Sequence, residues 1–264
     1  MLDFIKHALK SNRFTHPCYQ TLYNLYYQYL NFSWKFFFRR FRITAIKKHL
    51  LERKRSIDYL YGVDTAGRIE VFNLKIDSPN KFKSLQYQPS HEALFKTLLT
   101  MEKIPKQGFV FIDFGAGKGL PLLLASFHPF KKIIGVEFSE ELCAIARKNI
   151  LKIRNNAQRC QDITILFMDV TRYVIPDDPV ILYMCNPFND EIMIKVVELI
   201  EQRIIRSPEP LLVIYLNPRH VEVLNASVLL QNVTEHHLAD CADPRFAKLF
   251  SFHAARVDQV TGPR

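Results

Sequence analysis

Between residues 105 and 257, short apolar runs alternate with segments whose apolar positions recur every three or four residues. Five runs have the length and composition of buried strands: 109–115, 131–138, 163–169, 180–186 and 210–217. Helical periodicity is found between them, at 120–127, 139–153, 190–205 and in a short segment after 217. This alternation predicts an α/β protein in which helices cover both faces of a parallel sheet.

Two weaker strand patterns follow near 229–238 and 248–257, and the segment DCADPRF between them is too short for a crossover helix. They predict a C-terminal antiparallel hairpin, which makes the sheet seven-stranded and mostly parallel. Upstream, residues 69–72 have a strand pattern, and Ser90 is the expected N-cap of a helix over 91–103. Because ligands bind at the carboxyl ends of parallel strands, the residues at those ends are the candidates for a site.

The charge of the chain is confined to its beginning. The 264 residues have a net charge of +10, and residues 1–55 hold twelve Lys or Arg but two acidic residues, whereas the remainder holds 24 Lys or Arg and 24 Asp or Glu. Thirteen of the 33 aromatic residues lie between Phe4 and Phe41. We therefore expect a basic helical appendage over 1–55, a connecting segment and helix over 56–104, and a main domain over 105–264.

Several roles are open for this appendage. Tyr19, Tyr23, Tyr26 and Tyr27 fall on one face of a helix. Such a segment can lie on a membrane, bind nucleic acid, close over a site as a lid, or pack its rings on a domain and leave its charges in water. We favour packing or a lid over peripheral membrane contact and over nucleic-acid binding.

Composition excludes several classes of protein. With 48% hydrophobic and 23% charged residues the chain can form a sizeable core and is not disordered. Its five cysteines are never spaced C-x-x-C, so we expect neither a disulfide scaffold nor a structural zinc site, and we expect a reducing cytoplasm. No apolar run approaches the roughly 18 residues that span a bilayer. The histidines, among them His128, His236, His237 and His253, have no metal-ligand spacing with acids, so no metal is expected.

The first strand ends in a glycine turn, Asp113-Phe-Gly115-Ala-Gly117-Lys-Gly119. Glycine lets backbone N–H groups approach a ligand, and Glu137, at the end of the second strand, can accept hydrogen bonds from the ribose of an adenosine. The dinucleotide pattern G-x-G-x-x-G is broken by Leu120, and the phosphate-binding pattern G-x-x-x-x-G-K-[ST] is absent. The carboxylate of Asp113 repels a pyrophosphate but attracts the ammonium and sulfonium groups of S-adenosylmethionine.

With VEF (136–138), FMD (167–169) and NPF (186–188), this turn resembles the motifs of class I S-adenosylmethionine-dependent methyltransferases. The resemblance covers about residues 105–257, and more narrowly the chain looks like a group of bacterial methyltransferase-like proteins. It implies a Rossmann-like fold and S-adenosylmethionine as the cofactor. The residues that it implies in cofactor binding are Tyr87, Gln88, Asp113, Gly115, Ala116, Gly117, Gly119, Glu137, Phe138, Asp169 and Asn186.

The resemblance also divides this set by role. Asp113 and the glycines correspond to the residues that hold the methionine end, and Glu137 to the one that holds the ribose. Phe138 corresponds to a residue beside the adenine, and Asp169 to one that accepts a hydrogen bond from the adenine amino group. Tyr87 and Gln88 precede the domain where related enzymes close over the methionine portion.

Asn186-Pro187-Phe188 resembles the [D/N]-P-P-[Y/F/W] motif of methyltransferases that act on amino nitrogens, with one proline instead of two. That motif positions a planar NH₂ group, and these residues are therefore the candidate catalytic residues. A strand-to-helix turn in which Phe188 packs below is an equal interpretation. A second Asn-Pro pair ends the fifth strand, where Arg219 and His220 border the acceptor site or have a structural role.

The sequence thus predicts a methyltransferase that acts on a nitrogen, with a protein side chain as the first expectation because the main domain is electrically neutral. A nucleic-acid amino group is the alternative acceptor, with residues 1–55 as a binding arm. A non-catalytic S-adenosylmethionine-binding interaction module is the alternative outside enzymes.

Overall fold

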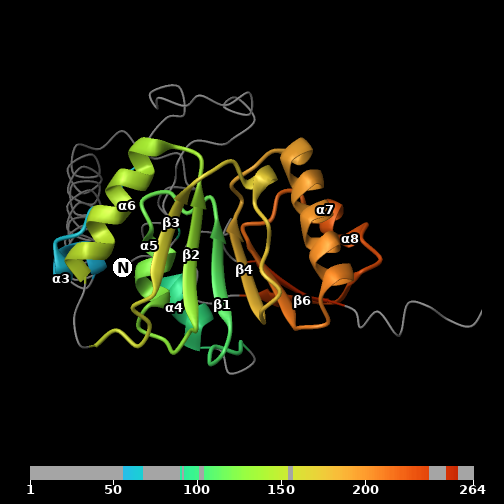
Figure 1. The fold of residues 1–264 in the computed structure, drawn as a ribbon, viewed down its shortest axis with the longest axis horizontal. Coiled ribbons are helices and arrows are strands. Elements are labelled where there is room, and N and C mark those ends of the chain that lie inside the picture. The colour runs from blue at the N-terminus through green and yellow to red at the C-terminus, as the bar shows by residue number, and fades with distance from the viewer. Residues whose placement is uncertain are drawn as a thin grey trace, which may run out of the picture. The chain divides into compact units, whose positions relative to one another are not determined.

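The computed structural model describes residues 56–67, 90, 92–100, 104–153, 157–237 and 248–254 (Figure 1). The described elements belong to one compact unit, Ile57–Arg264. The expected appendage over 1–55, the expected strand over 69–72, and Tyr87 and Gln88 all lie outside the described residues.

A sheet with the strand order β3-β2-β1-β4-β5-β7-β6 forms the centre of this unit. The five strands that run parallel to one another are β1 (Val110–Phe114), β2 (Lys132–Glu137), β3 (Ile163–Phe167), β4 (Val180–Cys185) and β5 (Leu211–Leu216). Two further strands, β6 (Leu230–His237) and β7 (Lys248–Ala254), are antiparallel, and β7 lies between β5 and β6. The chain order reverses between β1 and β4, so the carboxyl ends of these strands border the switch point where open sheets bind ligands.

Helices cover both faces of the sheet, as the sequence pattern predicts. Phe111 of β1 belongs to a core formed with α4 (Glu92–Thr100), α5 (Leu120–Ala125) and α6 (Glu140–Ile153). Its neighbour Ile112 belongs to the opposite core, formed with α7 (Asp190–Arg206) and α8 (Val221–Asn225). In Figure 1, α6 and α7 accordingly lie on opposite sides of the strands. All of β1 is buried, which explains its continuous apolar run.

The close packing of α5 on β2 depends on a glycine inside the strand. A Cβ at Gly135 would lie 2.6 Å from Cδ1 of Ile165, 2.7 Å from Cδ1 of Leu122 and 2.8 Å from Cβ of Ala116. Contacts this short are forbidden, so the absence of a side chain at Gly135 allows α5 and the turn before it to approach the sheet.

Two short elements have no counterpart in the sequence prediction. The helix α3 (Ile57–Tyr61) precedes the main domain, and the 3₁₀ helix η3 (Val170–Arg172) follows β3. Both are too short to show a helical period. No helix in the described part of the chain has the length and apolar character needed to cross a bilayer.

Candidate active site

A hollow opens at the carboxyl ends of the parallel strands. Four predicted site residues, which follow four different strands, line it: Gly115, Phe138, Asp169 and Phe188. The remaining lining residues are apolar and were not predicted, namely Val136, Met168, Val170 and Ile192. The hollow therefore has the character of a small-molecule pocket, with apolar walls and few polar groups.

The glycine turn after β1 forms one rim of this hollow. Its glycines have left-handed φ values, +79° at Gly115, +53° at Gly117 and +86° at Gly119, which side chains rarely adopt. The N–H groups of Gly115 and Ala116 donate to the carbonyl of Val136, at 2.9 and 3.2 Å. A Cβ at Gly115 would lie 2.6 Å from Cβ of Pro187. This glycine thus allows the turn after β1 to contact the turn after β4.

Glu137 fastens the same turn to the beginning of α6. Its Oε2 accepts from the N–H of Gly117 at 2.9 Å, and its Oε1 accepts from the N–H of Ser139 at 2.9 Å. Burial raises the pKa of Glu137, although its backbone N–H donors act in the opposite direction. Each carboxylate oxygen has a further lone pair, so these bonds leave acceptor capacity for a ribose hydroxyl. The sequence predicted the ligand role of Glu137 and missed this structural one.

Asp113 has a different environment. It is 2% exposed, and among the described residues its Oδ2 has no hydrogen-bond partner. Burial, and secondarily the negative charge of Glu137, raises the pKa of Asp113 well above its usual value. A buried polar atom without a partner is rare in native proteins, and a carboxylate in this state is an acceptor for a cation.

A second polar group lies beside Asp113 on the face of the sheet that α4 covers. Tyr183 is its register neighbour on β4, and the Tyr183 hydroxyl donates to Oγ of Ser90 at 3.1 Å. This bond fixes the chain immediately before α4 next to the end of β1. Ser90, expected as a helix cap, therefore has a contact with the central sheet that the sequence did not indicate.

Asp169 follows β3 and begins η3. Its Oδ1 accepts from the backbone N–H of Thr171 at 3.0 Å and from the Thr171 hydroxyl at 2.8 Å, which makes it the N-cap of this short helix. The Asp-x-Thr spacing is the signal for this role, because an aspartate side chain caps the N–H two residues later.

Asn186 and Phe188 differ in their surroundings, although they belong to one motif. Asn186 has a left-handed φ of +45°, and its Oδ1 accepts from the hydroxyl of Tyr215 at 3.2 Å. Phe188 is 5% exposed and packs in the core on the α7 side, where part of it lines the hollow. Asn189 then caps α7 through a bond from the N–H of Ile192 at 3.2 Å. The burial of Phe188 fits the structural interpretation, whereas Asn186 and Pro187 lie at the glycine turn.

The second Asn-Pro pair lies at the end of the adjacent strand. Asn217 has a φ of +51°, and Leu216 before it is paired in register with Cys185 before Asn186. Arg219 is exposed, and Nδ1 of His220 lies 3.6 Å from Oε1 of Glu222. Tyr215 was not predicted, yet its hydroxyl reaches Asn186 from the neighbouring strand, a contact that depends on strand order and cannot be read from spacing.

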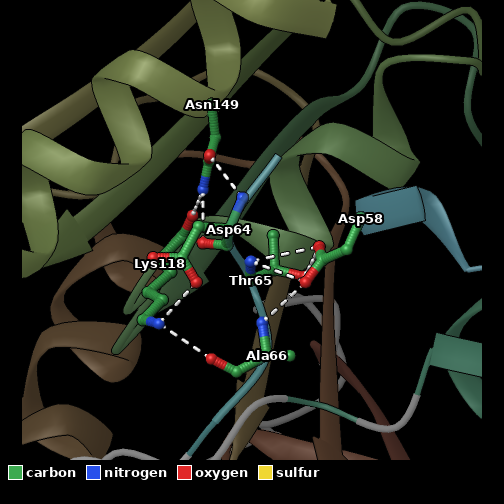
Figure 2. A network of polar contacts seen from close by, with 6 residues as sticks. All are labelled: Asp58, Asp64, Thr65, Ala66, Lys118 and Asn149. Carbon is green, nitrogen blue, oxygen red and sulfur yellow. Dashed lines mark hydrogen bonds and ion pairs between the residues drawn. The ribbon is translucent and has the colours of Figure 1, made fainter. Parts of the chain in front are cut away.

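A polar network that connects the glycine turn and α6 to residues 58–66 was not predicted from the sequence. Figure 2 shows Lys118, Asn149 and Asp58 converging on residues 64–66, which precede the main domain in the sequence. No group of His, Cys, Asp and Glu in the described ranges is arranged to hold a metal ion.

No protein-family model matches the chain, and no curated protein does either. Similar solved structures include a SAM-dependent methyltransferase from Aquifex aeolicus, with 16% identity, 69% of this chain and 95% of that chain covered, and a TM-score of 0.43. An rRNA methylase from Streptococcus thermophilus has 9% identity, 62% and 92% coverage and a TM-score of 0.40. A ribosomal protein L11 methylase from Lactobacillus delbrueckii subsp. bulgaricus has 12% identity, 62% and 76% coverage and a TM-score of 0.40. Two of these names state an acceptor, rRNA in one and a ribosomal protein in the other.

Proposed function

We propose that the protein is a methyltransferase that uses S-adenosylmethionine. The observation that carries this proposal is the buried carboxyl of Asp113, whose Oδ2 has no hydrogen-bond partner among the described residues. It lies at the end of β1, beside the glycine turn, where a cationic ligand would supply the missing partner. A phosphate-containing cofactor is disfavoured, because Asp113 and Glu137 place two carboxyl groups together and no described residue gives Asp113 an opposing charge.

The hollow supports the adenosine part of the proposal. Its walls include Phe138 and Met168, apolar side chains of the kind that line small-molecule sites. The resemblance implies that the Asp169 carboxylate, which also caps η3, accepts a hydrogen bond from the adenine amino group. Glu137 would receive the ribose hydroxyls in addition to the N–H groups that it holds.

S-adenosylmethionine, when bound, supplies a methyl group on a positively charged sulfur. The task of this chain is to hold a nucleophile in line with that methyl and to exclude water. Asn186 Oδ1 would accept a hydrogen bond from an amino group, and the bond from Tyr215 fixes the direction in which this oxygen points. The amino nitrogen loses its proton as the new bond forms, and we assign solvent as the destination of that proton.

We assign the acceptor to a nitrogen on a protein side chain. Outside residues 1–55 the numbers of basic and acidic residues are equal, which is unlike the surface that binds a nucleic-acid duplex. An amino group of a nucleic acid, with residues 1–55 as the binding arm, is the alternative acceptor. Residues 1–55 are assigned to packing or to a lid, with peripheral membrane contact less favoured, and the compartment to the cytoplasm.

The burial of Phe188 favours a second candidate function. A ring that is 5% exposed does not present a face on which a planar amino group can stack. A protein with an intact cofactor site and a filled acceptor site would be a non-catalytic S-adenosylmethionine-binding module.

Isothermal titration with S-adenosylmethionine and with its demethylated product tests the shared part of both candidates. We expect both ligands to bind, and absence of binding by the folded protein would contradict both. Transfer of a tritiated methyl group into cell extract, followed by separation of protein, nucleic acid and small molecules, then distinguishes the two. Label in protein supports the assigned acceptor, label in nucleic acid supports the alternative acceptor, and binding without transfer supports the module.

A further inference from the structure

Residues 57–67 are fastened to the glycine turn, although they lie far from it in the sequence. Nζ of Lys118, the residue between Gly117 and Gly119, donates to Oδ1 of Asp64 at 2.8 Å and to the carbonyl of Ala66 at 2.7 Å (Figure 2). These acceptors precede Lys118 by 54 and 52 residues. The segment that precedes the main domain thus contacts the turn that the proposed function assigns to the cofactor.

Asn149 of α6 joins the same two parts of the chain. Its Oδ1 accepts from the N–H of Asp64 at 2.9 Å, and its Nδ2 donates to the carbonyl of Asp64 at 2.8 Å. Nδ2 also donates to the carbonyl of Lys118 at 3.0 Å. One buried carboxamide therefore binds the backbone of the segment and the backbone of the turn together.

The segment has a fixed shape at the point of contact. The carboxylate of Asp58 in α3 accepts from the N–H of Thr65 at 3.0 Å, from the N–H of Ala66 at 3.0 Å and from the Thr65 hydroxyl at 2.6 Å. These bonds close residues 58–66 into a loop. The acceptors that Lys118 uses are thereby held in one arrangement, which lowers the entropy lost when they bind the ammonium group.

The glycine turn is held at its first part by Val136 and Glu137, which accept from the N–H groups of Gly115, Ala116 and Gly117, whereas the side chain of Lys118 is held by residues 64–66. Gly117 and Gly119 flank Lys118 and allow many backbone conformations. The Lys118 side chain is 7% exposed, and a buried ammonium group needs acceptors. If residues 57–67 were displaced, Lys118 would move toward water and the backbone on either side of it would move too. The docked segment therefore adds to the bonds from Val136 and Glu137 and holds the part of the turn around Lys118.

We infer that residues 57–67 are part of the cofactor site: by binding Lys118 and Asn149 they set the conformation of the glycine turn, and ligand affinity is coupled to their docking. Lys118 and Asn149 are positioning residues, which act on the cofactor through the turn. This inference rests on the proposed function for the identity of the ligand. Because coupling is reciprocal, S-adenosylmethionine also stabilises the docked segment.

Titration of the full chain with S-adenosylmethionine tests the inference. Lys118→Met retains the aliphatic stem and removes the donor, and we expect it to weaken binding by about tenfold or more, within the usual range of coupling between sites. Lys131→Met is the matched control, because Lys131 pairs with Asp178 at the amino end of the sheet and is 59% exposed. We expect the control to bind within about twofold of the unchanged protein, the range of a surface substitution.

Asp64→Ala is the second variant, for the case in which Lys118→Met does not fold. The Asp64 side chain is 62% exposed, so its removal leaves the core intact. It removes the carboxylate acceptor of Lys118, and a smaller loss of affinity is expected because the Ala66 carbonyl remains.

Hydrogen exchange of the apo protein provides a readout that does not depend on the ligand. We expect Lys118→Met to accelerate exchange in 57–67 and also at the amides of 115–119, and we expect S-adenosylmethionine to slow both in the unchanged protein. Faster exchange in 57–67 with unchanged exchange in the turn, or with unchanged affinity, would overturn the inference. If the unchanged protein does not bind S-adenosylmethionine, the proposed function fails, and the apo exchange result still decides whether the segment controls the turn.

Discussion

Asp113 and Glu137 are buried carboxyl groups at the ends of neighbouring strands, and they differ in their hydrogen-bond donors. Glu137 accepts two backbone N–H groups, whereas Oδ2 of Asp113 has no partner within the described residues. A carboxyl without donors is more stable protonated, and it becomes useful as an anion when a cation arrives. The protonated form of Asp113 therefore favours the stability of the empty protein, whereas the anionic form favours affinity for a cationic ligand.

We predict that Asp113→Asn stabilises the empty protein and weakens S-adenosylmethionine binding by roughly thirtyfold, which corresponds to loss of one charge-assisted bond of about 2 kcal/mol. Thermal unfolding without ligand and titration with ligand measure the two effects. Asp178→Asn is a suitable control, since Asp178 is a partly exposed acid, remote from the glycine turn, that pairs with Lys131. Equal binding by the Asp113→Asn variant and the unchanged protein would remove the main support for the proposed function.

A pH dependence follows from the raised pKa of Asp113. The carboxyl is bound more strongly to its proton in the folded protein than in the unfolded chain, so its contribution to folding stability is greatest at low pH and falls as the pH rises through the folded-state pKa. Ligand affinity changes in the other direction, because the anion is the form that binds a cation. Titrations across this range should show tighter binding at higher pH in the unchanged protein, and a flatter profile in Asp113→Asn.

We expect Gly115→Ala to destabilise the protein by about 2 kcal/mol or more, because a side chain at a left-handed φ costs about 1–2 kcal/mol and Pro187 blocks the Cβ. Gly67→Ala is the matched control, with a φ of +86° and no atom within 4 Å of the added Cβ. Chemical denaturation compares the two. A similar decrease in the free energy of unfolding in both variants would mean that the contact with Pro187 does not contribute to the destabilisation.

Tyr215→Phe should lower the rate of methyl transfer by roughly tenfold while the affinity for S-adenosylmethionine stays unchanged, because it removes the donor that orients Asn186 and leaves the ring in the core. Tyr173→Phe is the control, since Tyr173 is also a buried ring of the same core. Single-turnover kinetics with the identified acceptor separates rate from affinity. A fall in affinity without a fall in rate would place Tyr215 in the cofactor site instead.

Deletion of residues 1–55 is expected to leave S-adenosylmethionine affinity within about twofold of the full chain, the range of changes remote from a site. Deletion of residues 1–67 also removes the acceptors of Lys118 and should weaken binding. Titration of both truncated proteins, after circular dichroism has shown that they are folded, compares these outcomes. Loss of binding in the first deletion would show that the basic segment contributes to the site.

The strands and long helices could be predicted from the sequence because burial on both faces produces continuous apolar runs, as in β1, and burial on one face produces a helical period, as in α7. Once the strands are located, the residues that follow them are known as well. The carboxyl ends of parallel strands lie at one edge of the sheet, so these residues could be predicted to lie together. Gly115, Phe138, Asp169 and Phe188 line one hollow as a result.

The contacts that connect these residues could not be predicted in the same way. Tyr215 reaches Asn186, and Lys118 reaches Asp64, across separations that leave no local pattern. The hydrogen bonds from Gly117 and Ser139 to Glu137 depend on the backbone conformation of the glycine turn. The burial of Phe188 depends on how α7 packs on the sheet. The sequence analysis assigned no role to Lys118, and the burial of this side chain against Asp64 was not predicted.

The absence of a side chain at Gly135 restricts which substitutions the glycine turn and its neighbours can accept. A methyl group there would collide with Ala116, Leu122 and Ile165, which belong to the turn, to α5 and to β3. A lineage that gained a side chain at this position would have to shrink several of these neighbours together, or let α5 withdraw from the sheet. Glycine at 135 and the small residue at 116 are therefore expected to be inherited as a pair in any descendant that keeps the acidic glycine turn.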